Sequence, residues 1–389
     1  MSKRSCLTNL LEFLEDVTKL IDTGHQVDLL YLDFSRAFDK VPHQRLMLKI
    51  QSMGITGNVA GWIESWLSGR QQRTVLNGKF SEWSDVTSGV PQGSVLGPCL
   101  FIIEAAVDTI LRVKKFADDT KACAVADNNE NCQAIQKQID ELFKWSVDWQ
   151  MLFNLDKCKI IHLGKDNLKF DYTLGGTPLI KADSEKDLGV YLDNSLTPSM
   201  HIAEAVKKAN KMLGQLLRTI SYRDRVHLYK QHVQCHLEYA VQAWNPWLKK
   251  DTDLMESVQK RAVRCIKGLH GSYEEKLIQL NLPSLVERRK RGDMIQTYKI
   301  IHQIDEVDPK TRFQFRDNRP TRGNMQIDNG GIARKKLSLN APWCQTDVRR
   351  NFYSNRVVRP WNELPEDVKN AKSVSSFKNT YDKFMLSVR

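Results

Sequence analysis

The sequence predicts an α+β fold in which helices pack against a mixed β-sheet. Residues 7–21 and 132–153 both place apolar side chains at helical spacing. Between these two segments, residues 29–32 form a continuous apolar run, which is typical of a strand buried on both faces. Two helices that enclose such strands, without a strict alternation of strand and helix, favour the α+β class.

The remaining elements are predicted from breaks in these patterns. Glycines at positions 54 and 57 interrupt a helical pattern, and Asn77-Gly78 is a typical two-residue turn of a β-hairpin. Beyond residue 165, strands punctuated by glycine give way to a helical region that is broken at residues 244–247. We therefore expect helices over 44–66 and 201–278, a hairpin over 70–86, a strand over 159–163 and a β segment over 171–192.

Composition places the chain among globular proteins. Its 389 residues, 41% hydrophobic and 27% charged, can bury a sizeable core and form two or three domains. No apolar run reaches the roughly 18 residues that a membrane span needs, and the first residues do not resemble a signal peptide. Eight cysteines without a Cys-x-x-Cys pair indicate reduced thiols. We therefore expect an intracellular protein, nuclear or cytoplasmic, without a membrane partner.

Positive charge is concentrated in the last quarter of the chain. The net charge is +12, and residues 286–389 contain 22 Lys and Arg against 12 Asp and Glu. Such a surplus predicts contact with phosphates. In the helical region, Lys260, Arg264 and Lys267 are spaced to form one cationic face, for which a solvated helix surface is an equally good interpretation.

Two adjacent carboxylates, Asp118 and Asp119, are the first candidate site. They follow Phe116 between two segments that are typical of the strands of a hairpin. Acids are common in such turns, where they bond to nearby backbone, so this pair alone is weak. Asp33 also ends a short apolar strand, and if the strands lie side by side the three carboxylates converge. Such a trio is what a pair of divalent cations needs.

A glycine-rich loop over residues 88–98 is the second candidate. Its three glycines and two prolines exclude a regular helix throughout, so we expect a loop that opens a buried helix over residues 99–111. The glycines either let the backbone approach a ligand or form a tight connection. The loop lacks the lysine of a phosphate-binding P-loop, which excludes a P-loop triphosphatase.

Three segments together resemble the palm motifs of reverse transcriptases. They are residues 32–43 (LDFSRAFDKVPH), 89–98 (GVPQGSVLGP) and 116–121 (FADDTK), in the order and at a workable spacing for that family. The chain is most similar to the enzymes of non-LTR (LINE-like) retrotransposons of the jockey and chicken-repeat type, N-terminally truncated. The similarity continues through residues 186–190, 244–246 and 361–365 and so covers nearly the whole chain.

The resemblance implies a right-hand polymerase of the α+β class. A palm with partial fingers would span residues 1–165, a thumb-like or connection region residues 166–285, and a basic C-terminal region residues 286–389. In the family, further finger strands and an endonuclease region precede the segment that begins at Ser5. The link between Pro98 and Phe116 is also shorter than in the family, which would displace the acidic pair.

The resemblance also implies a set of site residues. Asp33, Asp118 and Asp119 would hold two Mg²⁺ ions, and Lys157 would assist the pyrophosphate. Phe38 would lie under the sugar and reject a 2′-hydroxyl, while Gln92 and Gly93 would lie against the template and the nascent base pair. The expected substrate-binding residues are Phe34, Phe38, Gln92 and Gly93.

By this resemblance the function is that of an RNA-directed DNA polymerase. It would extend a DNA primer on an RNA template with deoxynucleoside triphosphates. The alternative is a non-catalytic nucleic-acid-binding remnant that keeps the fold and the basic surfaces. A two-metal nuclease is a third interpretation, which the Pro91-Gln92-Gly93 loop disfavours. The first two interpretations differ in turnover, and the polymerase requires Asp33 to lie close to the acidic pair. The oligomeric state stays open.

Overall fold

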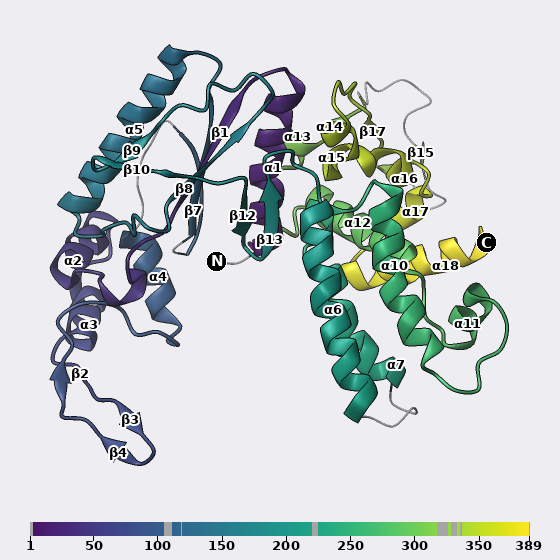
Figure 1. The fold of residues 1–389 in the computed structure, drawn as a ribbon, viewed down its shortest axis with the longest axis horizontal. Helices are drawn as coiled ribbons and strands as arrows, with labels where there is room; N and C mark the ends of the chain where they lie inside the picture. The colour runs from purple at the N-terminus through teal and green to yellow at the C-terminus, as the bar shows by residue number, and fades with distance from the viewer. Residues whose placement is uncertain are drawn as a thin grey trace. The chain divides into compact units, whose positions relative to one another are not determined.

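The chain forms two compact units. The computed structural model describes residues 3–104, 111–117, 119–219, 225–316, 326–327, 333–334 and 337–388. One unit is His25–Asp183, and the other combines Met1–Gly24 with Ser184–Arg389 (Figure 1). The three regions expected from the sequence, 1–165, 166–285 and 286–389, stay a prediction, and the compact units do not follow those bounds.

The unit His25–Asp183 is built on a five-stranded mixed sheet. Its strand order is β11-β8-β1-β7-β6, so β1 is the central strand. Strand β1 runs antiparallel to both of its neighbours, while β11 runs parallel to β8. The predicted strands over 29–32 and 159–163 are confirmed. The strands are β1 (Val27–Leu32), β6 (Arg112–Phe116), β7 (Asp119–Val125), β8 (Lys159–Leu163) and β11 (Ile180–Lys181).

Helices pack against one face of this sheet. Leu30 and Leu32 of β1 share a buried core with Phe101 and Ile139, which lie on two of the helices. The break that was predicted at Gly54 and Gly57 falls between α2 and α3. The helices are α2 (His43–Ser52), α3 (Gly57–Leu67), α4 (Leu96–Glu104) and α5 (Asn129–Asp148), with a short 3₁₀ turn at Ala37–Asp39 and a small hairpin of β9 (Thr173–Leu174) and β10 (Thr177–Pro178).

Two helix bounds differ from those predicted. Helix α4 begins at Leu96, three residues early, and residues 105–110 of the expected helix lie outside the described residues. Helix α5 ends at Asp148, whereas apolar periodicity predicted a helix to residue 153. The chain leaves the helix because Gln150 adopts a left-handed conformation, and Phe153 then pairs with Phe34 as an extended residue.

The predicted hairpin over residues 70–86 is confirmed and is called the hairpin arm below. It consists of β2 (Gln71–Gln72), β3 (Val75–Leu76), β4 (Lys79–Phe80) and β5 (Ser84–Asp85), with β2 paired to β5 and β3 to β4. Asn77 and Gly78 both have positive φ angles, of 50° and 76°. Two positive angles in succession are those of a type I′ turn, which matches the twist of a hairpin.

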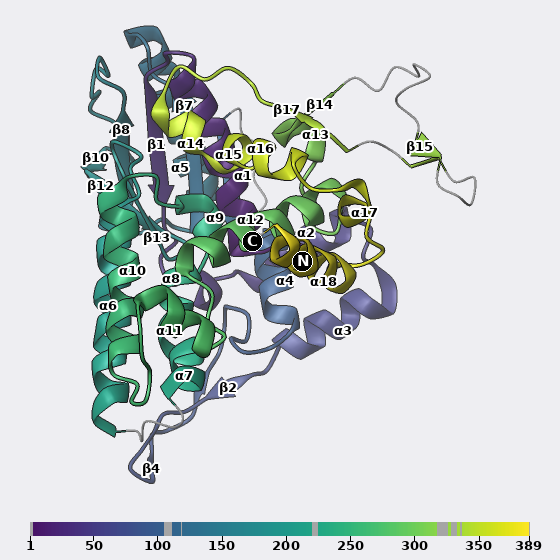
Figure 2. The same cartoon turned by 90° about the vertical axis from the view of Figure 1, so that its right-hand side faces the viewer.

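The second unit is mainly helical. Helices α6 and α10 pack side by side, as both ribbon views show (Figures 1 and 2). The break expected at residues 244–247 follows α9. The principal elements are α1 (Cys6–Asp22), β12 (Ser184–Asp187), β13 (Val190–Asp193), α6 (Ser199–Thr219), α7 (Arg225–Leu228), a π-helical turn (Tyr229–Val233), α8 (Gln234–Glu238), α9 (Val241–Trp244), α10 (Lys249–Arg264), α11 (Tyr273–Gln279) and α12 (Leu285–Ile301).

The C-terminal part of this unit has an aromatic core. Trp361 is fully buried, donates a hydrogen bond from Nε1 to the Leu337 carbonyl at 2.7 Å, and stacks on Phe377. The elements are α13 (Pro309–Arg312), β14 (Gln314–Phe315), β15 (Gln326–Ile327), β16 (Ala333–Arg334), β17 (Leu339–Asn340), α14 (Asp347–Asn351), α15 (Tyr353–Arg356), α16 (Val358–Asn362), α17 (Glu366–Lys369) and α18 (Val374–Ser387). None of the helices in the described part of the chain is long and apolar enough to cross a membrane.

A buried ion pair joins the first helix to the C-terminal region. Glu15 of α1 accepts a hydrogen bond from Arg349 of α14 at 2.7 Å, and both side chains are almost fully buried. Burial alone would raise the pKa of Glu15, but the Arg349 hydrogen bond and charge, with Lys19, lower it below its usual value. Residues more than 300 positions apart therefore belong to one unit.

Candidate active site

Asp33 lies at the end of the central strand. The last residue pair between β1 and β7 is Leu32 with Thr120, so the next pair outward is Asp33 with Asp119. On the other side of β1, Tyr31 pairs with Lys159, which brings Lys157 opposite Asp33. Because paired residues of neighbouring strands leave the same face of a sheet, the register places Asp119 beside Asp33, while Lys157, in the turn before β8, lies on the other side of Asp33. The structure thus brings together three of the expected site residues.

Lys157 and Asp33 form a direct ion pair. The Lys157 Nζ lies 3.0 Å from Asp33 Oδ2, with the lysine side chain 64% exposed and the aspartate 33% exposed. The Asp33 carbonyl accepts a hydrogen bond from the Asn154 backbone N–H at 2.8 Å and a longer one from Cys158 Sγ. Burial raises the pKa of that thiol to about 11, so it is protonated and can donate at neutral pH. These bonds hold the end of β1 against the turn that carries Lys157.

The acidic turn connects β6 and β7. Phe116 pairs with Asp119, so the chain reverses direction between these two residues. Ala117 has a φ of 55°, as a tight hairpin turn requires. Asp118 lies outside the described residues, so its position stays a prediction. The hairpin itself was predicted correctly, and its turn lies at the same end of the strands as Asp33.

Phe34 is a core residue in the structure. Its side chain is 4% exposed and stacks on Phe153 at a centroid distance of 4.8 Å, with Phe101 and Trp145 edge-on at 6.3 Å each. The sequence placed Phe34 among the substrate-binding residues, but a side chain enclosed in this way does not present a surface to a ligand. Its position instead fixes the backbone next to Asp33.

The glycine-rich loop lies against the turn that follows Asp33. The Gly89 N–H donates to the Val41 carbonyl at 2.8 Å, and the Val90 N–H donates to the Phe38 carbonyl at 2.7 Å. A Cβ at Gly89 would lie 2.6 Å from the Asp39 carbonyl oxygen, so only glycine fits this close approach. Of the two interpretations of the glycines, the tight connection is the one that the described contacts show at Gly89.

The other expected substrate residues lie on these two segments. Phe38 is half-buried and stacks on Phe101 at 4.8 Å, while Gln92 is exposed and donates from Nε2 to Asp39 Oδ1 at 3.2 Å. Gly93 has a φ of 82° with open space where a Cβ would be. The structure brings Phe38 and Gln92 to neighbouring segments, and their roles toward a nucleotide stay predictions.

The sequence did not predict three side chains that support the loop, those of Arg70, His43 and Ser88. The Gly89 carbonyl accepts hydrogen bonds from Arg70 Nη2 at 2.7 Å and from His43 Nε2 at 2.8 Å. The Asp39 carbonyl accepts one from the Ser88 hydroxyl at 2.9 Å. Asp39 and His43 lie in the first palm-like motif, which was the available signal. Nothing local to Arg70 indicates its partner.

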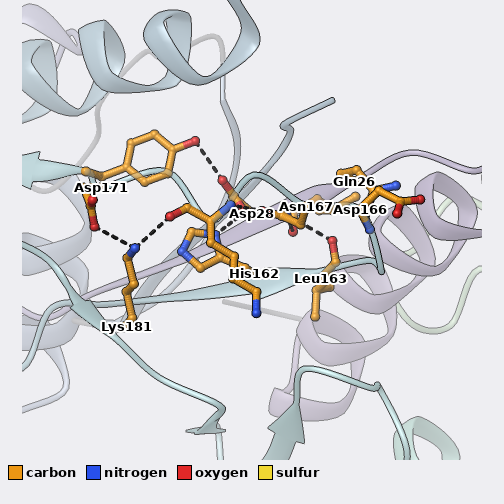
Figure 3. A network of polar contacts seen from close by, with 11 residues as sticks. Gln26, Asp28, His162, Leu163, Asp166, Asn167, Asp171 and Lys181 are labelled. Atoms are coloured by element: carbon orange, nitrogen blue, oxygen red, sulfur yellow. Dashed lines mark hydrogen bonds and ion pairs between the residues drawn. The ribbon is translucent and has the colours of Figure 1, made fainter. Parts of the chain in front are cut away.

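Asp28, the carboxylate within β1, is held in the interior by hydrogen bonds and so has a structural role (Figure 3). It is fully buried and accepts hydrogen bonds from His162 Nδ1 at 2.6 Å, Asn167 Nδ2 at 2.9 Å and the Tyr172 hydroxyl at 2.7 Å. Burial and the neighbouring Asp28 raise the pKa of Tyr172. The His162 Nε2 has no hydrogen-bond partner among the described residues. This cluster ties β1, β8 and the segment after β8 together.

Comparison with known protein families agrees with the motifs. Residues 2–214, more than half of the chain, match the family described as reverse transcriptase (RNA-dependent DNA polymerase). The chain belongs to the reverse transcriptase family. The resemblance seen in the sequence is therefore confirmed, as is the α+β fold of a right-hand polymerase palm. Members of this family use divalent metal ions, to which carboxylates such as Asp33 and Asp119 are suited.

The curated relatives are enzymes of mobile elements. The RNA-directed DNA polymerase from mobile element jockey of Drosophila funebris is 28% identical over 61% of this chain and 28% of the relative. The probable RNA-directed DNA polymerase from transposon X-element of Drosophila melanogaster is 26% identical over 65% of this chain and 30% of the relative. The chain thus spans about 30% of the length of the curated reverse transcriptases of mobile elements that it matches.

The solved structures include telomerases. A telomerase from Candida albicans in complex with a TWJ fragment of telomeric RNA is 12% identical, with a TM-score of 0.36, and the match covers 80% of this chain and 50% of that chain.

Within the residues that the structure describes here, no group of three His, Cys, Asp or Glu side chains gathers as a metal site. The third expected carboxylate, Asp118, lies outside them.

Proposed function

We propose that this chain is an RNA-directed DNA polymerase, with its active site at the end of the sheet where β1 ends and β7 and β8 begin. The observation that carries the proposal is the ion pair of Lys157 with Asp33 at the end of β1, next to Asp119 in the strand register. A paired lysine and carboxylate at a strand end can be a surface ion pair of little energetic consequence. Here the pair is flanked by a second carboxylate, lies beside the acidic turn, and belongs to a chain of the reverse transcriptase family.

The residues fit a divalent cation. Asp33 and Asp119, together with Asp118, would hold two Mg²⁺ ions, whose chemistry is to activate a primer 3′-hydroxyl and to stabilise charge on the triphosphate. Lys157 would keep a positive charge beside Asp33 for the leaving pyrophosphate. Phe38 would define the sugar pocket, because its stack on Phe101 fixes the ring.

A nucleic-acid duplex would be held without reading its sequence. Exposed lysines and arginines lie along α6 and α10. Arg261 of α10 donates a hydrogen bond to Asn210 of α6 at 3.0 Å, which joins the two helices. Cations spaced along packed helices suit the phosphate backbone, which fixes the position of a duplex and carries no sequence information. The exposed cations of this surface include Lys207, Lys208, Lys211, Arg218, Lys260, Arg261, Arg264 and Lys267. The template would be RNA, the primer DNA and the substrates deoxynucleoside triphosphates.

Primer extension on a poly(rA) template with an oligo(dT) primer and Mg²⁺ tests this proposal. Asp33→Asn should reduce incorporation on the order of a hundredfold or more, because it removes a charge that acts at the reacting phosphate. The matched control is Asp171→Asn, which alters an exposed carboxylate of the same unit that pairs with Lys181. Equal activity of the two variants would contradict the role of Asp33.

The same preparation separates the polymerase from its alternative. A wild-type chain that binds template and primer, with an affinity that falls as salt rises, but incorporates nothing would be a non-catalytic nucleic-acid-binding remnant. The exposed cations of α6 and α10 would serve either function, so turnover decides between the two.

A further inference from the structure

Gln92 extends from a turn whose backbone is fixed on both sides. On one side, the Val90 N–H donates to the Phe38 carbonyl at 2.7 Å. On the other side, Ser94 closes the turn by donating to the Pro91 carbonyl from its hydroxyl at 2.8 Å and from its N–H at 3.4 Å. The backbone of Gln92 therefore lies between two anchored points, and the contacts of its side chain decide where its amide group points.

Asp39 determines which end of the Gln92 amide faces the protein. The Gln92 Nε2 donates to Asp39 Oδ1 at 3.2 Å. An ionised carboxylate has acceptors and no donor, so only the nitrogen end of an amide can bond to it. If the amide were turned round, its oxygen would face the carboxylate and be repelled. The Gln92 Oε1 therefore points away from Asp39, and no group in the described part of the chain donates a hydrogen bond to it.

The backbone of Asp39 is itself held in place. Its N–H donates to the Arg36 carbonyl at 2.9 Å, and its carbonyl accepts a hydrogen bond from the Ser88 hydroxyl at 2.9 Å. Both partners of the pair thus extend from anchored backbone, on two segments that come into close contact at Gly89. A single exposed hydrogen bond contributes little to stability. The effect of the pair is therefore to set the direction of the Gln92 amide.

The space next to Gln92 is open. Gly93 has a φ of 82°, and nothing lies within 4 Å of the position that a Cβ would take. A glycine in an exposed turn lets a ligand approach the backbone closely. Gln92 and Gly93 together present a hydrogen-bond acceptor beside open space, which suits a small donor on a bound nucleic acid. RNA carries such a donor, the ribose 2′-hydroxyl, which DNA lacks.

We propose that Asp39 is a positioning residue, which directs the Gln92 Oε1 toward a ribose 2′-hydroxyl of the RNA template. Gln92 accepts the hydrogen bond, and Asp39 acts through Gln92 without touching the nucleic acid. The inference rests on the proposed polymerase function, and it adds that this pair favours an RNA template over a DNA template. A polar group that bonds to a hydroxyl discriminates against the analogue without it, because the group is then left unpaired.

Template preference tests the proposal. Extension of an oligo(dT) primer on poly(rA) and on poly(dA) gives kcat/KM for each template. Asp39→Ala should lower the value on poly(rA) about fivefold, the effect of one hydrogen bond, and change the value on poly(dA) little. Asp39→Asn should lose no more than about twofold on poly(rA), because one of its two orientations still accepts from Gln92. The matched control is Asp85→Ala, which removes the carboxylate that accepts from Gln71 Nε2 on the hairpin arm at 2.8 Å and should leave both values unchanged.

A double-mutant cycle tests whether Asp39 acts through Gln92. Gln92→Met keeps the length of the side chain and removes its polar atoms, so it should show the same loss on poly(rA). Asp39→Ala should then add nothing on the Gln92→Met background, because residues that act as a pair are not additive. Additive losses, or equal losses on RNA and DNA, would overturn the proposal. Urea unfolding midpoints equal to that of the wild type, as expected for two exposed side chains, exclude a loss of folding.

A readout without turnover separates this inference from the proposed function. NMR of the full chain, isotope-labelled at its glutamine side chains, gives the Gln92 amide signal, which is the one missing in Gln92→Met. Asp39→Ala should shift this signal, Asp85→Ala should not, and an RNA–DNA hybrid should shift it more than a DNA duplex does. If the wild type incorporates nothing but shows these shifts, the polymerase function fails while the inference holds. A Gln92 signal that is unchanged in Asp39→Ala, or that responds equally to both duplexes, would overturn the inference even in an active polymerase.

Discussion

Replacing Gly89 by alanine tests whether the glycine-rich loop is fixed by its contact with the turn after Asp33. Gly89 has a φ of 87°, and a Cβ there would lie 2.6 Å from the carbonyl oxygen and 2.7 Å from the Cα of Asp39. These atoms belong to the backbone and cannot rotate away. The same residue receives hydrogen bonds from Arg70 and His43, so a shift of Gly89 disturbs both.

The expected loss of unfolding free energy in Gly89→Ala has two parts. An alanine in the left-handed region costs about 1–2 kcal/mol, and forcing a methyl group into a filled space costs about 1–3 kcal/mol more. Gly54→Ala is the matched control, because Gly54 has a φ of 83° and nothing within 4 Å of a Cβ. Gly54→Ala should therefore lower the free energy of unfolding by only the first part. The difference between the two variants, about 1–3 kcal/mol, measures the contact with Asp39.

Urea unfolding measures that difference, and primer extension measures its consequence. If the loop holds Gln92 against the template, as the family resemblance implies, Gly89→Ala should lower incorporation on the order of a hundredfold, as a displacement of about 1 Å can. Gly54→Ala should leave it near the wild-type value. A Gly89→Ala protein no less stable than Gly54→Ala would refute the reasoning, because it would mean that the two segments are not in contact.

Two further predictions concern stability. Burial, with repulsion from Lys208 and Lys186, lowers the pKa of His201 from 6.5 to about 4. Because folding lowers the pKa of this base, its contribution to stability is complete above pH 6.5 and is lost as the pH falls toward 4. Between pH 7.5 and pH 4.5 the wild type should therefore lose about 2–3 kcal/mol of unfolding free energy more than His201→Asn, as measured in urea; equal losses would contradict this. Arg349→Ala should cost about 3–5 kcal/mol because it leaves Glu15 charged and buried, whereas Arg350→Ala, which breaks an exposed pair with Asp347, should cost less than about 1 kcal/mol. Similar losses for the two variants in urea unfolding would show that the Glu15 pair is not decisive.

Local chemistry determined the parts of the fold that the sequence predicted well. Apolar continuity predicted β1, and the Asn77-Gly78 turn predicted the hairpin arm, because each signal acts over a few residues. The predicted end of α5 was wrong because apolar periodicity continues to residue 153. The backbone instead turns at Gln150, and Phe153 pairs with Phe34, which follows β1. The grouping of α1 with the C-terminal region depends on Glu15 and Arg349, which no local pattern connects.

The sequence predicted those residues of the candidate site that belong to the family's motifs. Two of the motif-like segments indicated Asp33 and Asp119, and the family resemblance indicated Lys157. The strand register places Asp119 beside Asp33, and Lys157 forms an ion pair with Asp33. The contacts of Arg70 with Gly89 could not be predicted, because they depend on how a helix end and a distant loop pack. The burial of Phe34 was missed for a related reason: an aromatic residue next to a candidate ligand has the same sequence signal whether it faces a substrate or the core.

Asp28 in β1 and Asp33 just past its end show why position along a strand decides the role of a carboxylate. The two residues are an odd number of positions apart, so their side chains leave opposite faces of the sheet. Asp28 shares its face with Leu30 and Leu32, under α5, where burial requires the three hydrogen bonds that it receives. Asp33 lies on the other face and one residue beyond the strand, where its carboxylate can meet Asp119 and Lys157 and still reach water. A shift of one residue in the β1 register would exchange these environments, burying the candidate ligand and exposing the structural acid. The buried Asp28 cluster, which fixes that register, is therefore a condition for the site at the end of the strand.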